Sequence, residues 1–111
     1  KNIKKRYKEL QKNEFNNNIF FIRAAKSLAD LKSEANQQKN CVYTNYSEDY
    51  AYGDTDIYFL RELKKPEKSV VTVEVLNGKI RQKYQKKNTE VTPEQEKFLE
   101  LWEKNVINKV A

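Results

Sequence analysis

The alternation of apolar and polar positions changes its period along the chain. Over residues 1–16 and 27–39, apolar side chains recur every three or four positions, which is typical of amphipathic helices. Over residues 57–85 they alternate with polar side chains or form short runs, which is typical of β-strands. The helical period returns after Thr92. This order of elements predicts an α+β fold.

Four segments have the length and the side chains of strands: residues 19–22, 57–60, 70–76 and 79–85. Asn77-Gly78 separates the last two and favours a two-residue type I′ hairpin turn, because both turn positions need a positive φ. We therefore expect a small antiparallel sheet of three to four strands with helices packed on one face. The whole chain, residues 1–111, is expected to form one domain, in which residues 1–16 are a basic amphipathic helix.

A two-residue loop also predicts the register of the hairpin, with Glu74 opposite Arg81 and Val73 opposite Gln82. On this register Gln82 shares a face with the valines of the preceding strand. That apolar face must be covered, and we expect the last helix to cover it with Phe98, Leu101 and Trp102.

Gln82 is the unusual residue of this register, because a buried amide is unfavourable unless it is hydrogen-bonded. One interpretation is a core residue bonded to a backbone group or a Tyr hydroxyl. The other is that Gln82 lines a polar pocket with Cys41 and Tyr46. Cys41 itself is expected to be a buried structural thiol rather than a nucleophile, since free cysteines are among the most buried residues.

Charge adds a second kind of candidate site. The chain carries 22 Lys and Arg against 16 Asp and Glu, a net charge of +6, which favours nucleic acid or an acidic protein surface as a partner. Basic residues gather on the first helix and the last hairpin. The candidate binding residues are Lys4, Lys5, Arg6, Lys8, Arg81, Lys83, Lys86 and Lys87. The alternative interpretation is a solvated surface without a partner.

Several classes of function are disfavoured by what the chain lacks. There is no His and one Cys, so Ser–His and Cys–His nucleophile pairs and most soft-metal sites are excluded, as is an internal disulfide. The carboxylates have no spacing diagnostic of a Mg²⁺ site. We therefore assign no catalytic residue, no metal ligand and no cofactor. We also expect a cytoplasmic location, and no apolar run approaches the roughly 18 residues that span a membrane.

A scattered set of residues carries a family resemblance. The set is Ser27, Leu28, Asp30, Leu31, Glu34, Asn40, Cys41, Val42, Tyr46, Gly53, Ile57, Phe59, Arg61, Thr72, Glu74, Gln82, Asn88 and Trp102. In order and spacing it resembles the PcfJ-like family, named for a protein of a conjugative plasmid. Ala35 and Gln85 stand where the family pattern has Gly.

The resemblance implies a setting in conjugative plasmids, phages and related bacterial elements, and it implies no particular reaction. We therefore expect a non-enzymatic binding module of a mobile genetic element that contacts nucleic acid or a protein partner. Two alternatives stay open. One is an inhibitor of a host defence complex of the CRISPR type, and the other is an enzyme that acts on nucleic acid.

Overall fold

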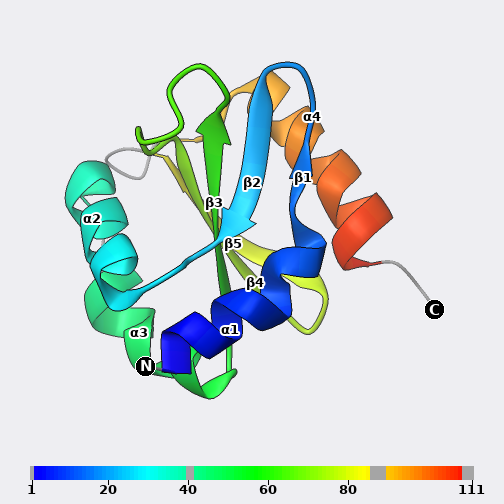
Figure 1. The fold of residues 1–111 in the computed structure, drawn as a ribbon. Coiled ribbons are helices and arrows are strands. Elements are labelled where there is room, and N and C mark those ends of the chain that lie inside the picture. Colours follow the sequence, from blue (N-terminus) through cyan, green and yellow to red (C-terminus); the bar gives the residue numbers. More distant parts are fainter. Residues whose placement is uncertain (1, 40–41, 86–89, 109–111) are drawn as a thin grey trace.

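A five-stranded antiparallel sheet forms the centre of the computed structural model, which describes residues 2–39, 42–85 and 90–108 (Figure 1). The strand order follows the chain order, β1-β2-β3-β4-β5. The strands are β1 (Phe15–Asn16), β2 (Phe20–Ala24), β3 (Asp56–Glu62), β4 (Val71–Leu76) and β5 (Lys79–Gln85). The helices are α1 (Asn2–Leu10), α2 (Leu28–Gln38), α3 (Val42–Tyr52) and α4 (Pro93–Trp102), with the short helical segments η1 (Gln11–Asn13) and η3 (Glu103–Ile107).

The predicted α+β fold with an antiparallel sheet is confirmed, but the expected three to four strands are too few. The additional strand is β1, which pairs Phe15 with Ile22 of β2. A two-residue strand has no alternation that a sequence pattern can detect. Phe15 becomes a strand residue because its ring also packs against Phe98 of α4, with 5.5 Å between the ring centroids. Tertiary contacts therefore decide this element.

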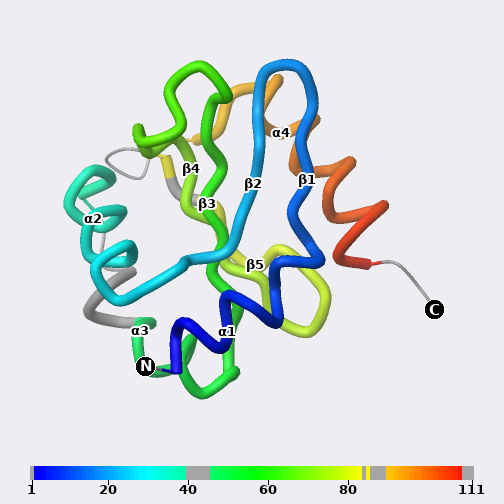
Figure 2. Tube along the Cα trace, in the orientation of Figure 1, coloured from blue at the N-terminus to red at the C-terminus, as the bar shows by residue number. Residues whose placement is uncertain are grey.

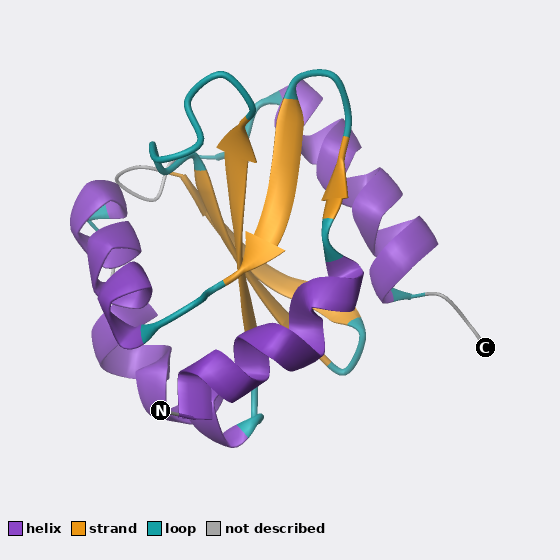
Figure 3. Cartoon of the chain, in the orientation of Figure 1, coloured by secondary structure: helices purple, strands orange, loops and turns teal. Residues whose placement is uncertain are grey.

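Helices contact both faces of the sheet, which corrects the expectation of one covered face (Figure 3). On one face, Trp102 of α4 packs edge-on against Tyr58 of β3, with 4.7 Å between ring centroids. On the other face, the Thr72 hydroxyl of β4 donates a hydrogen bond to Glu34 of α2. Thr72 is buried there although it is polar. The sheet is thus buried on both sides, with a polar layer under α2.

Both predicted helix starts at α2 and α4 are confirmed. Ser27 caps α2 by accepting the Asp30 N–H through its hydroxyl, at 3.0 Å. Thr92 and Gln95 form a reciprocal capping box at the start of α4. Leu101 of α4 was expected to be buried, but it is 44% exposed, and the neighbouring Leu99 is buried in its place.

The N-terminal helix is shorter than the predicted range 1–16, because α1 ends at Leu10 and the chain continues through η1 into β1. Its amphipathic character is present: Ile3 and Leu10 are buried. Arg6 bonds Asp56 at the start of β3, so α1 lies across that end of the sheet (Figure 2). Within the described residues, no helix has the length and apolar content needed to cross a membrane.

The β4–β5 hairpin has the predicted turn but only part of the predicted register. Val75 pairs with Ile80, as a two-residue loop requires, and a β-bulge between Glu74 and Val75 then shifts the pairing by one residue. Glu74 consequently faces Gln82 rather than Arg81. Because a one-residue shift moves a side chain to the other face, Gln82 joins the polar layer rather than the valine face.

Replacing Gly78 by Ala should lower the free energy of unfolding by about 1 kcal/mol, because Gly78 has φ +76 and a Cβ is disfavoured there. The nearest heavy atom that an added Cβ would meet is 4.0 Å away, so backbone strain rather than a clash sets the cost. Urea denaturation measures the effect. Lys79→Ala on the exposed adjacent position is the control, and equal stability of the two variants would contradict the turn type.

Candidate functional site

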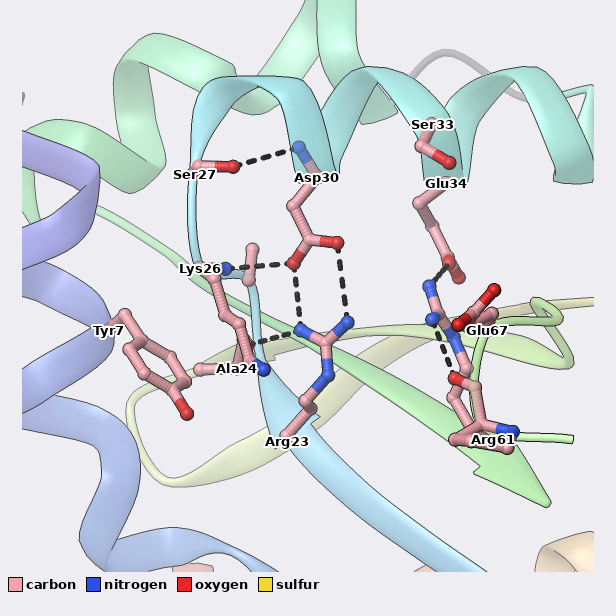
Figure 4. Close-up of polar contacts among 12 residues, drawn as sticks. Tyr7, Arg23, Ala24, Lys26, Ser27, Asp30, Ser33, Glu34, Arg61 and Glu67 are labelled. Atoms are coloured by element: carbon pink, nitrogen blue, oxygen red, sulfur yellow. Dashed lines mark hydrogen bonds and ion pairs between the residues drawn. The ribbon is translucent and has the colours of Figure 1, made fainter. Parts of the chain in front are cut away.

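Two arginines of the sheet form ion pairs with two acidic residues one turn apart on α2 (Figure 4). Arg23 binds Asp30 with both terminal nitrogens, at 2.7 and 3.2 Å. Arg61 binds Glu34 at 2.6 Å. Both guanidinium groups lie over the ring of Phe59, 5.3 and 5.2 Å from its centroid. These contacts hold the two arginines in fixed positions beside α2.

The Glu34 carboxylate is fully buried, and each of its two oxygens accepts a hydrogen bond. One accepts from Arg61, and the other accepts from the Thr72 hydroxyl at 2.6 Å. Burial raises the pKa of Glu34 despite these favourable partners. Burial also raises the pKa of Asp30. The hydrogen bonds from Arg23 and from the Lys26 backbone outweigh this effect, so the pKa of Asp30 lies below its usual value.

The polar layer continues along β4 and β5 towards α3. Thr55 donates its hydroxyl to Glu74 at 2.6 Å, and the Gln82 amide donates to the Tyr46 hydroxyl at 3.4 Å. Gln82 and Tyr46, two of the three residues of the predicted pocket, are thus in contact on the face opposite to the valines, and the bond is to a Tyr hydroxyl. Cys41, the third residue of the predicted pocket, lies outside the described residues. A ligand pocket at these residues stays a prediction.

A cleft of about 490 Å³ opens between α2, the strands β2 and β3, and the loop that follows β3. It is lined by Phe21, Arg23, Lys26, Asp30, Ser33, Arg61, Pro66 and Glu67. Figure 4 shows Lys26 between this cleft and Tyr7 of α1. The buried Arg61 Nε has no hydrogen-bond acceptor among the described residues. Sequence reasoning missed this cleft, because its lining comes from two distant stretches, residues 21–33 and 61–67, that the fold brings together.

The candidate basic residues of α1 fall into two groups. Lys4, Lys5 and Lys8 are exposed, and none has an ion-pair partner in the described part of the chain. Arg6 differs, because it forms ion pairs with Glu9 and Asp56. Its Nε also donates to the Tyr50 carbonyl at 3.0 Å. Arg6 is therefore a structural anchor of α1 rather than a free cation.

The candidate basic residues of the hairpin also differ in their surroundings. Arg81 is exposed at the bulge of β5. Lys83 forms an ion pair with Glu96 of α4, at 2.5 Å between Nζ and Oε1. Lys86 and Lys87 lie outside the described residues. Among the described residues, no three His, Cys, Asp or Glu side chains are grouped so that they could hold a metal ion.

A sequence model of one protein family, described as PcfJ-like protein, matches residues 1–99. The chain belongs to the PcfJ-like protein family. The PcfJ-like chain is also 33% identical over 103 residues to a protein of Listeria innocua that is described as "Uncharacterized protein Lin1253/Lin1744". The match covers 92% of this chain and 22% of that protein, so the chain spans about a fifth of the relative's length. No solved structure matches the chain.

The residues that carried the family resemblance are not spread evenly over the PcfJ-like fold. Many of them contribute to the polar layer between the sheet and the helices α2 and α3. These are Asp30, Glu34, Tyr46, Phe59, Arg61, Thr72, Glu74 and Gln82. The signal that could have located the layer is the spacing of Asp30 and Glu34, four residues apart on one helical face.

Proposed function

We propose that this PcfJ-like chain is a non-enzymatic binding module of a bacterial mobile genetic element and that it contacts the phosphate backbone of nucleic acid. The observation that carries the proposal is the set of exposed lysines on α1. Lys4, Lys5 and Lys8 have no acidic partner within ion-pair distance among the described residues. Unpaired lysines on one helix are suited to phosphates, because each contact releases condensed counterions.

The fold holds α1 in a fixed place, which supports this role. Ile3 and Leu10 bury one side of the helix, and Arg6 ties it to Asp56 and to the backbone of Tyr50. The lysines therefore extend from a rigid support, so little ordering of the chain is needed on binding.

A second basic position lies at the same end of the sheet. Asp56, which α1 contacts, pairs across the sheet with Val75, close to the β4–β5 turn (Figure 1). Arg81 is exposed on the strand that follows this turn. Helix α1 and the hairpin can thus contribute to one electrostatic surface.

The acidic residues favour binding over catalysis. Glu34 and Asp30 neutralise the sheet arginines, and Asp56 pairs with Arg6. Catalytic carboxylates keep an oxygen available for a substrate. These three are engaged in ion pairs with arginines instead, including Asp30, which lines the cleft. The three ion pairs attach α1 and α2 to the sheet, and this structural role explains the arrangement of the carboxylates.

Replacing Lys4, Lys5 and Lys8 together by Ala should weaken binding to all DNA and RNA sequences alike, by tenfold or more at low salt. We expect the logarithm of affinity to fall linearly with the logarithm of salt, and the triple variant to lose roughly 2 from this slope, at about 0.7–0.9 per phosphate contact. Fluorescence anisotropy with labelled single strands and duplexes, over a series of salt concentrations, measures both quantities.

The matched control removes three exposed lysines from other regions: Lys64 and Lys68 in the β3–β4 loop and Lys97 on α4. It changes the net charge equally, so it separates a localised surface from overall charge. Equal losses in the two triple variants would contradict an α1 site. If the wild-type chain binds neither DNA nor RNA at low salt, the proposal is wrong and an acidic protein surface becomes the favoured partner.

A further inference from the structure

Lys26 extends the basic surface of α1, although it is distant from α1 in the sequence. It lies in the link between β2 and α2, and its ammonium is 5.8 Å from the centroid of the Tyr7 ring on α1. Lys26 is exposed and has no acidic ion-pair partner among the described residues. On α1, Lys4 is one turn before Tyr7 and Lys8 follows it directly. The fold therefore places Lys26 over the Tyr7 ring, beside a helix that carries Lys4 one turn away and Lys8 at the next position.

Lys26 also lines the cleft beside α2, where two further cationic groups form the wall (Figure 4). Arg23 and Arg61 are held there by Asp30 and Glu34. A guanidinium has five N–H donors. The hydrogen bonds of Arg61 go to Glu34 and to the Pro66 carbonyl, and its Nε–H has no acceptor among the described residues. The wall of the cleft thus contains one fixed donor, the buried Arg61 Nε–H, that the ion pairs do not use.

We infer that a single strand of nucleic acid bound along α1 continues past Tyr7 and places a phosphate in the cleft beside α2, with Lys26 as its first contact. This inference rests on the proposed function and specifies the class of nucleic acid. A flexible strand can turn from a helix surface into a recess of about 490 Å³. A duplex is stiff over about 150 base pairs and cannot follow such a turn within one small domain.

The charge balance of the cleft gives the inference a two-sided test. The carboxylates of Asp30 and Glu34 are neutralised by their arginines. Two exposed charges on the lining remain without ion-pair partners among the described residues: Lys26, which attracts a phosphate, and Glu67, which repels it. Removing the charge of Lys26 must therefore weaken the binding of nucleic acid, and removing the charge of Glu67 must strengthen it.

The experiment compares Lys26→Ala, Glu67→Gln and the control Lys32→Ala by anisotropy on one labelled single strand and on the duplex with its complement. Lys32 is exposed on α2 and does not line the cleft. We expect Lys26→Ala to weaken single-strand binding roughly threefold to tenfold and to lower the salt slope by roughly 0.7. Glu67→Gln should strengthen single-strand binding. Duplex binding and the Lys32 variant should stay near wild type, and thermal unfolding confirms that each variant is folded.

Each outcome bears on one of the two proposals. If Lys26→Ala behaves like Lys32→Ala while the α1 triple variant has lost binding, the cleft inference is wrong and the α1 surface stands. If Lys26→Ala weakens single strand and duplex equally, the preference for a single strand is wrong. If the wild-type chain binds no nucleic acid, both proposals fall together.

Discussion

Replacing Trp102 by Ala will lower the free energy of unfolding by about 3–5 kcal/mol. The Trp102 side chain is fully buried and packs edge-on against Tyr58, with 4.7 Å between the ring centroids. Its indole N–H donates to the Asn13 carbonyl at 2.7 Å, which ties α4 to η1. Truncation therefore leaves a cavity between α4 and the sheet and removes a hydrogen bond that joins two helical segments.

Leu101→Ala is the matched control, because Leu101 precedes Trp102 on the same helix and is 44% exposed. We expect a loss of less than about 1 kcal/mol for this variant. Urea denaturation monitored by circular dichroism gives both values without relying on Trp fluorescence. A loss under about 1 kcal/mol for Trp102→Ala would mean that the ring does not lie in the core.

Replacing Arg61 by Ala should cost about 3–5 kcal/mol, because it leaves the fully buried Glu34 carboxylate without its counter-charge. Chemical denaturation measures this loss. The loss should shrink at acidic pH. The pKa of Glu34 is already raised by burial and rises further without Arg61, so protonation relieves the buried charge in the folded state.

Two comparisons make the Arg61 experiment specific. The double variant Arg61→Met with Glu34→Leu removes both charges and should regain most of the stability, since apolar replacements of buried pairs are often tolerated. Lys83→Ala breaks the partly exposed pair with Glu96 and should cost less than about 1 kcal/mol. If the deficit of Arg61→Ala is the same at every pH, Glu34 is not the group responsible.

Local signals predicted the parts of the fold that local interactions determine. Ser27 and Thr92 cap helices through their own side chains, and Asn77-Gly78 forms its turn through backbone conformation. The register beyond the turn depends instead on the bulge between Glu74 and Val75, beyond which Glu74 faces Gln82 and bonds Thr55. No pattern within the hairpin predicts it.

The buried polar layer was not predicted for a related reason. Glu34, Thr72 and Glu74 have the polarity of surface residues, and only the position of α2 and α3 over the sheet buries them. For the basic residues, sequence identified the lysines but not their partners. Arg6 and Lys83 become engaged with acids that are distant in the chain. Lys26 was missed because its approach to Tyr7 exists only after folding.

The ion pairs of α2 also have a consequence for how the chain assembles. Strand order follows chain order, so each strand pairs with the next one along the chain. Short connections link β1 to β2, β3 to β4 and β4 to β5. A long loop, residues 25–55, links β2 to β3. Closing a long loop carries an entropic cost before any contact compensates for it. Asp30 binds Arg23 of β2, and Glu34 binds Arg61 of β3. Helix α2, which lies inside this loop, thus holds β2 and β3 together, and these are the two strands whose pairing has the largest entropic cost of loop closure.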